Sequence, residues 1–176
     1  ADAWKGIMMD ATQSQIKVFN ISTTDAEDFA FDYDAGSSDL LTELVPDLDN
    51  WGTVGWMELM DFEYDGNKQI INLLVETKWL PPTEWLRNAS VGTHYFSNKL
   101  ITMTTIQKDE TVVRGVAVMD GEVLQDKPIL EFEPEFIGKH YDDEQPEYDL
   151  DKLDNTIWDS ITKFVTVCEQ FYLEGE

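Results

Sequence analysis

Basic residues are scarce in this sequence. Only 12 Lys and Arg stand against 36 Asp and Glu in 176 residues, which leaves a formal net charge of -24. A compact chain of this length is roughly 40 Å across, and roughly 40 Å of duplex DNA carries a similar charge. Such a protein repels phosphate backbones and anionic lipids, so we expect it to bind neither nucleic acid directly nor membranes. Its expected partners are basic surfaces.

Cysteine and long apolar runs are also lacking. The single Cys168 excludes a disulfide within the chain and favours a reducing compartment. No apolar run approaches the ~18 residues that a membrane-crossing helix needs. These two absences predict a cytoplasmic protein without a membrane segment.

The usual signatures of catalysis and metal binding are missing. The two histidines, His94 and His140, have no nearby cysteine, so zinc-type spacing is absent. A calcium-loop pattern that starts at Asp32 fails at its sixth position, where Ser37 replaces the required turn glycine. There is no nucleophile elbow and no phosphate-binding glycine-rich loop. The sequence therefore predicts no enzymatic activity, no metal and no cofactor.

Apolar residues are present in the amount that a folded domain needs. Hydrophobic residues make up 42% of the chain and aromatic residues 12%, which argues against disorder. We expect one acidic domain over residues 1–176. Its core is predicted at about 15–129, an acidic arm at 130–149 and a C-terminal helix at 150–173.

Turn signals predict the elements of the core. The strongest is Asp65-Gly66, which separates apolar runs at 54–64 and 69–79 and is typical of a β-hairpin. The other predicted elements are a strand at 15–21, a short helix from Ser37 or Ser38 to Pro46, a helix opened by Pro81 and Pro82, strands at 95–107 and 111–119, and a turn at Asp120-Gly121 that leads to Val123 and Leu124.

The order of these elements is that of a β-α-β-β-α-β core. It predicts an α+β fold, a ferredoxin-like antiparallel sheet with two helices, to which an extra strand and a C-terminal amphipathic helix are added. Apolar residues at spacings of three and four indicate that last helix. This stripe can pack on the sheet of its own chain or on its twin in a homodimer. Its members are Leu150, Leu153, Ile157, Ile161, Phe164, Cys168 and Phe171.

Two short motifs around the hairpin resemble a known family. The run Asn50-Trp-Gly-Thr53 precedes the first hairpin strand, and Trp79-Leu-Pro-Pro82 follows the second, with Trp85 and Leu86 in the next helix. Over about residues 51–120 the chain resembles the YubB-like (Api92-like) ferredoxin-fold domain of phages and plasmids. The resemblance implies a ferredoxin-like fold and a mobile-element origin, hence the cytoplasm of an infected or host bacterium. It implies no activity and no catalytic residue.

The acidic residues are clustered along the chain. Residues 1–50 carry eleven acids and two bases, and residues 131–151 carry nine acids and one base, whereas residues 51–100 carry six acids and four bases. An even spread would indicate solubility or adaptation to salt, while clustering favours a dedicated electronegative surface. The expected partner-binding residues are Asp25, Glu27, Asp28, Asp32, Asp34, Asp39, Glu131, Glu133, Glu135, Asp142, Asp143, Glu144, Glu147 and Asp149.

The sequence leads to one functional hypothesis and one alternative. The hypothesis is a DNA-mimic inhibitor from a phage or mobile element, whose carboxylates occupy the DNA-binding surface of a host defence, recombination or nucleoid protein. Interleaved aromatic residues would add contact area at the centre of that interface. The alternative is a non-enzymatic phage or plasmid interaction or structural module whose acidity serves solubility only.

Overall fold

One antiparallel sheet organises the described part of this computed structural model, which comprises residues 11–34, 57–78, 81–92, 96–107, 112–131 and 155–174. The sheet has six strands in the order β2-β3-β1-β4-β5-β6. The mixed α+β class is confirmed, but the sheet contains one strand more than predicted. The elements are β1 (Ala11–Val18), α2 (Thr23–Asp34), β2 (Met57–Asp65), β3 (Ile70–Lys78), α4 (Thr83–Gly92), β4 (Ile101–Gln107), β5 (Val112–Met119), β6 (Glu122–Glu131) and α5 (Asn155–Tyr172).

The first face of the sheet is buried under α4. In β1, Ile16 stands opposite Leu73 of β3 and Met103 of β4, and all three side chains are buried. Side chains alternate between the faces of a strand, so every second residue joins this core. Helix α4 adds Trp85 and Leu86, both fully buried. Burial of such side chains contributes roughly 1.5–3 kcal/mol each and fixes α4 on the sheet.

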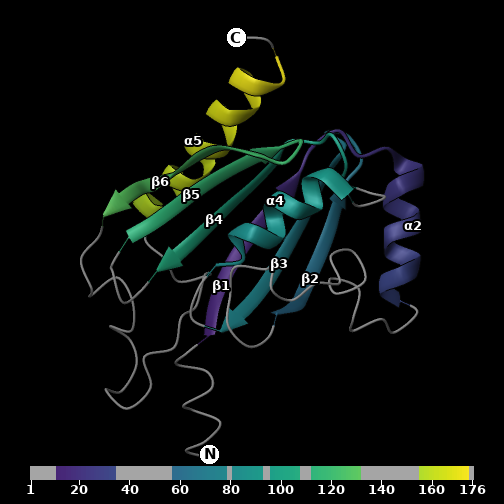
Figure 1. Cartoon of the computed structure of the whole chain (residues 1–176), viewed down its shortest axis with the longest axis horizontal. Helices are drawn as coiled ribbons and strands as arrows, with labels where there is room; N and C mark the ends of the chain where they lie inside the picture. Colours follow the sequence, from purple (N-terminus) through teal and green to yellow (C-terminus); the bar gives the residue numbers. More distant parts are fainter. Residues whose placement is uncertain are drawn as a thin grey trace, which may run out of the picture.

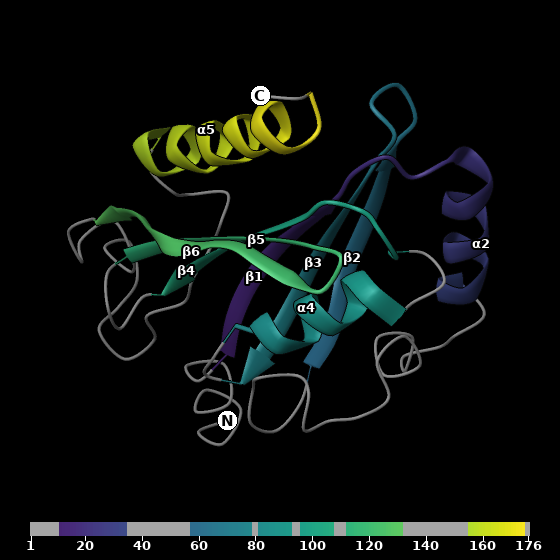
Figure 2. The same cartoon turned by 45° about the horizontal axis from the view of Figure 1, so that its top comes forward.

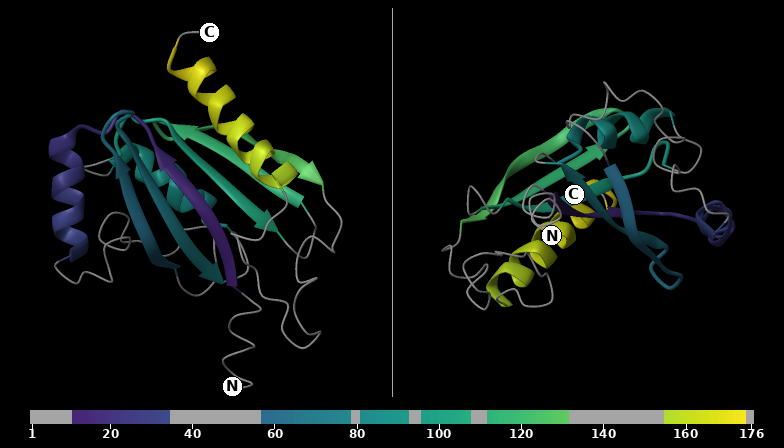
Figure 3. Two further views of the ribbon diagram at one scale, coloured as in Figure 1. Left: turned by 180° about the vertical axis from the view of Figure 1, so that it is seen from behind. Right: turned by 90° about the horizontal axis from the view of Figure 1, so that it is seen from below.

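The second face is partly covered by α5, which lies on the side opposite α4 (Figure 2). Ile157, Ile161 and Cys168 of α5 are buried against β4, β5 and β6 (Figure 3). The Phe164 ring of α5 lies directly on Gly115 of β5, where an added Cβ would be 2.8 Å from that ring. The predicted C-terminal helix is confirmed. Its apolar stripe packs on the sheet of its own chain, so a homodimer would need another surface.

The ends of the apolar stripe differ from the expectation. The helical spacing places Phe171 on the buried side, but its side chain is 62% exposed. It lies on the flank of α5, where its ring packs edge-on against Tyr172 at 5.1 Å between centroids. Leu150 and Leu153 lie outside the described residues.

Helix α2 is an element that the sequence patterns do not predict. The alternation of acids with Phe29, Phe31 and Tyr33 suggests only an acidic stretch, with a helix after Ser37. The structure instead starts a helix at Thr23, because the Oγ of Ser22 accepts a hydrogen bond from the backbone N–H of Asp25 at 3.1 Å. This is an N-cap, which satisfies one of the free donors of the first turn. The helix predicted from Ser37 or Ser38 to Pro46 lies outside the described residues.

The two tight turns differ in how they are formed. The predicted β2–β3 hairpin is confirmed, and the residue of its turn with a left-handed backbone is Gln69, with a φ of 58°. Asp65 organises this turn, since its Oδ1 accepts from the backbone N–H groups of Asn67 and Lys68 at 3.0 and 3.2 Å. At the β5–β6 turn, Asp120 and Gly121 have φ angles of 52° and 80°. Positive φ at both central residues is the primed geometry that suits a two-residue hairpin.

Three strand boundaries differ from those predicted. β1 spans Ala11–Val18 and not 15–21, and β4 begins at Ile101 and not at residue 95. β6 continues from the predicted turn to Glu131, so Leu130 and Glu131 belong to the sheet and not to an arm that starts at residue 130. The remainder of the proposed arm, 132–149, lies outside the described residues.

Candidate partner-binding surface

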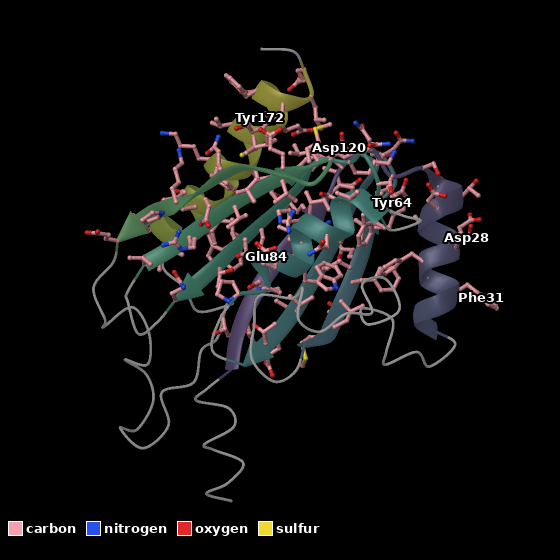
Figure 4. All side chains as sticks on the ribbon, in the orientation of Figure 1. Asp28, Phe31, Tyr64, Glu84, Asp120 and Tyr172 are labelled. Carbon is pink, nitrogen blue, oxygen red and sulfur yellow. The ribbon has the colours of Figure 1, made fainter. Side chains whose placement is uncertain are left out.

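Helix α2 carries the first group of predicted binding residues. Glu27 and Asp28 are exposed, and Asp25 in the first turn is half-buried. Asp32 and Asp34 follow in its last turn. The helix therefore contains five acids in all, and it contains no base. Asp28 and Phe31 point away from the sheet (Figure 4), and the Phe31 side chain is 73% exposed. This side of α2 therefore presents carboxylates next to a large exposed aromatic ring.

Aromatic contacts hold α2 against edge strand β2. Phe29 faces inward and is fully buried, with its ring edge-on to Phe62 of β2 at 5.3 Å between centroids. It also packs against Phe96 at 6.0 Å. The hydroxyl of Tyr64 in β2 donates a hydrogen bond to the carbonyl of Ile21, just before the helix, at 2.8 Å. As a result α2 stands beside β2 at one edge of the sheet (Figure 1).

Strand β2 supplies carboxylates that the sequence reasoning did not select. Asp61 and Glu63 are exposed, and Asp65 at the turn is half-buried. They alternate with Phe62 and Tyr64, which face the core. The whole strand has four acids and no base. The alternation of acidic and aromatic residues in this strand is the sequence signal that could have identified these carboxylates. The charge count over residues 51–100 hid them, because that range also contains Lys68 and other cations.

We define the acidic side as the 21 residues of α2 and β2, which lie at one edge of the sheet. Helix α2 packs on Phe62 at the first face, whereas Asp61 and Glu63 project from the second face. The acidic side contains nine acids and no Lys or Arg. The ion pairs among the described residues are elsewhere: Arg87 with Glu84 at 2.8 Å in α4, and Arg114 with Asp126 at 2.7 Å between β5 and β6. The described carboxylates of the acidic side thus form no ion pair with a described Lys or Arg.

Glu131, another predicted binding residue, does not lie on the acidic side. It ends β6, at the opposite edge of the sheet from β2 and α2 (Figure 1). That edge includes a groove of about 440 Å³ between β6 and α5, whose lining contains Lys127 and Lys163 and no acid. The other predicted residues lie outside the described part of the chain: Asp39, Glu133, Glu135, Asp142, Asp143, Glu144, Glu147 and Asp149.

Three further features of the described residues concern metal ligands, the cysteine and membrane spans. They include no group of three or more His, Cys, Asp or Glu side chains that could hold a metal ion. Burial raises the pKa of the Cys168 thiol to about 11, with Lys127 opposing weakly, so this sulfur is protonated and unreactive at neutral pH. No helix in the described ranges has the length and apolar character needed to span a bilayer.

Comparison of the chain with protein-family models, curated proteins and solved structures gave no match. The resemblance to the YubB-like domain therefore stays a prediction. Any function assigned to this chain must be argued from its own residues.

Proposed function

We propose that this protein is a non-enzymatic DNA mimic, which inhibits a basic host protein by occupying its DNA-binding surface. The observation that carries the proposal is the acidic side, where α2 and β2 contribute nine acids and no base. A row of uncompensated carboxylates is the charge pattern that a phosphate-binding surface attracts. The net charge of -24 adds long-range attraction to any basic partner.

Phe31 adds an exposed apolar surface to the acidic side. Large aromatic residues at the centre of an interface supply much of the binding free energy, whereas carboxylates at its rim mainly raise the association rate. An exposed Phe between carboxylates of one helix fits this division of roles. The Phe31 ring is 73% exposed and is therefore accessible to a partner that docks on this side.

The proposal also includes a ferredoxin-like core for the sheet and an origin of the protein in a phage or plasmid. Strands β1 to β4 stand in the order β2-β3-β1-β4, with every neighbouring pair antiparallel. β3 thus lies between β1 and β2, which are joined through α2, and this order supports a split βαβ core within the larger sheet. A phage or plasmid protein of this kind would act in the cytoplasm of its bacterial host and need no cofactor.

The proposal is tested by affinity capture from nuclease-treated bacterial lysate, with a salt gradient for elution. We expect a DNA-binding protein that leaves at moderate salt and is displaced by added duplex DNA. The same protein, once purified, should lose at least tenfold in affinity for the variant Asp25→Lys/Glu27→Lys/Asp28→Lys. Phe31→Ala should weaken binding with little change in its dependence on salt.

A matched control separates a specific surface from total charge. The variant Glu122→Lys/Asp159→Lys/Glu174→Lys makes the same charge change at exposed positions of β6 and of the α5 region, away from the acidic side. It should retain most of the affinity. Equal losses in both triple variants, or a partner indifferent to both salt and DNA, would overturn the mimic and favour the interaction module whose acidity serves solubility.

A further inference from the structure

A polar groove lies on the second face of the sheet, on the half that α5 leaves open. Its volume is about 390 Å³, which is within the range of small-molecule sites. Its floor comes from β1, β3 and β2, and Trp158 near the start of α5 forms part of its wall. The groove shares Asp61 and Glu63 with the acidic side, but ligand binding in it is measured on the isolated protein and does not depend on the proposed inhibitor function.

The strand register arranges the polar side chains of the floor in two rows. In the first row, Glu63 of β2 stands opposite Asn72 of β3, and Asn72 stands opposite Lys17 of β1. In the second row, Asp61, Leu74 and Gln15 follow in the same order. Neighbouring strands are ~4.8 Å apart, so the carboxylates and the ammonium rise from backbones roughly 10 Å apart. The groove is therefore dipolar, with its positive end at β1 and its negative end at β2.

Lys17 is a half-buried cation without a close anion. Its Nζ donates a hydrogen bond to the amide Oδ1 of Asn72, and no described carboxylate forms an ion pair with it. Burial lowers the pKa of Lys17, and repulsion from Lys68 adds to this, while more distant acids such as Glu63 oppose it. A partly desolvated ammonium gains from an anionic partner. The chain has three times as many acids as bases, yet no described acid forms an ion pair with Lys17. The anionic group of a ligand would supply that missing partner.

The opposite end of the groove suits a cation. Asp61 and Glu63 are exposed carboxylates that form no ion pair with a described Lys or Arg. Phosphates and other polyanions are disfavoured by these carboxylates and by the net charge, and simple cations are repelled by Lys17. A molecule that carries both charges, separated along its length, satisfies both ends.

We propose that this groove binds a small dipolar molecule with a carboxylate and a cationic amino or guanidino group, as in a free basic amino acid. The ligand carboxylate pairs with Lys17, and its distal cation pairs with Asp61 and Glu63. The aliphatic part of the ligand lies over Asn72 and Leu74, the β3 residues at the middle of the two rows. The side chain of a basic amino acid holds its two charges apart by a distance that suits strands roughly 10 Å apart.

Isothermal titration of the full chain with L-arginine, agmatine and L-citrulline tests this proposal. Agmatine lacks the carboxylate of arginine, and citrulline lacks its cation. We expect L-arginine to bind at least tenfold more tightly than either analogue. Failure of L-arginine to bind at millimolar concentration, or equal affinity for agmatine, would overturn the proposal, because any acidic protein attracts a simple cation.

Variants test which end of the groove binds the carboxylate of the ligand and which end binds its cation. Lys17→Met should remove the preference for L-arginine over agmatine, and Asp61→Asn/Glu63→Gln should remove the preference over citrulline. Lys68→Met is the matched control, since it removes one exposed lysine from the nearby hairpin turn; it should keep both preferences. Circular dichroism confirms that each variant is folded. An equal effect of Lys68→Met and Lys17→Met would refute the assignment of the carboxylate to Lys17.

Discussion

At the scale of single residues, burial decides which groups can react. Cys168 is fully buried on the side of α5 that faces the sheet, in contact with the cluster around Phe19 and Phe164. Because a thiolate is poorly solvated there, the thiol stays protonated. Lys17 shows the same effect for a cation, and burial lowers its pKa. Neither consequence can be read from residue type alone.

The raised pKa of Cys168 gives a prediction for reactivity and stability. An exposed thiol loses its proton near pH 9, whereas Cys168 keeps it until about pH 11. Between these values the unfolded chain binds fewer protons than the folded chain, so stability falls as pH rises, by up to roughly 2 kcal/mol. We expect no maleimide labelling of native protein at pH 7, and rapid labelling in urea.

The control for this prediction is Cys168→Ala. Urea unfolding of both proteins at pH 8 and pH 11 isolates the contribution of the thiol, since all other groups titrate in both. The difference in stability between the two proteins should shrink or reverse at high pH. A constant difference, or fast labelling of the native protein, would show that Cys168 is accessible.

At the scale of elements, sequence patterns predicted some parts of the fold and missed others for physical reasons. The hairpin and α5 follow from a turn signal and from a clear helical period. α2 was missed because its alternating aromatics suggested a period of two, although Ser22 and Asp25 have the spacing of a capping box. β6 was missed because it is an edge strand without alternation and contains Pro128, which only an edge tolerates.

The candidate surface was predicted only in part for a related reason. Charge counts identified the acids of α2, because they are close together in the sequence. The carboxylates of β2 became part of the same side only through the contact between Phe29 and Phe62, which are 33 positions apart. Such a contact is a property of tertiary packing and has no local signal.

The packing of α5 on β5 gives a prediction at this scale. Gly115→Ala should cost roughly 1–3 kcal/mol, because the new Cβ would lie 2.8 Å from the ring of Phe164. Gly66→Ala is the matched control, since its Cβ would meet only an ordinary contact at 3.7 Å with Tyr64. Urea unfolding measures both, and Gly66→Ala should be nearly neutral.

A double variant distinguishes a local clash from a general loss of stability. In the Gly115→Ala background, Phe164→Leu should recover part of the stability, because a smaller side chain leaves room for the Cβ. The coupling energy from the double-mutant cycle should therefore be clearly favourable. Strictly additive costs would mean that the contact between Gly115 and Phe164 does not limit the packing of α5.

At the scale of the whole molecule, self-repulsion is the largest electrostatic effect. A net charge of -24 opposes compaction, and with only two ion pairs among the described residues little of it is neutralised locally. We expect the melting temperature to rise between 0.05 and 0.5 M NaCl, as the screening length falls below ~10 Å. Differential scanning calorimetry measures this directly.

The triple lysine variant of α2 serves as the control. It lowers the magnitude of the net charge by six, so its melting temperature should depend less on salt than that of the native chain. A melting temperature that is independent of salt in both proteins would indicate that the acids are spaced too widely to repel one another.

The position of β1 has a consequence for how the protein is made. β1 is a central strand, and its partners β3 and β4 are far along the chain: Ser14 pairs with Val75 and with Thr105. During synthesis β1 therefore has exposed edges until first β3 and then β4 have been made. Pairing over such separations closes large loops and slows folding. The acidic residues on either side of β1 would then protect the nascent chain from aggregation while it waits.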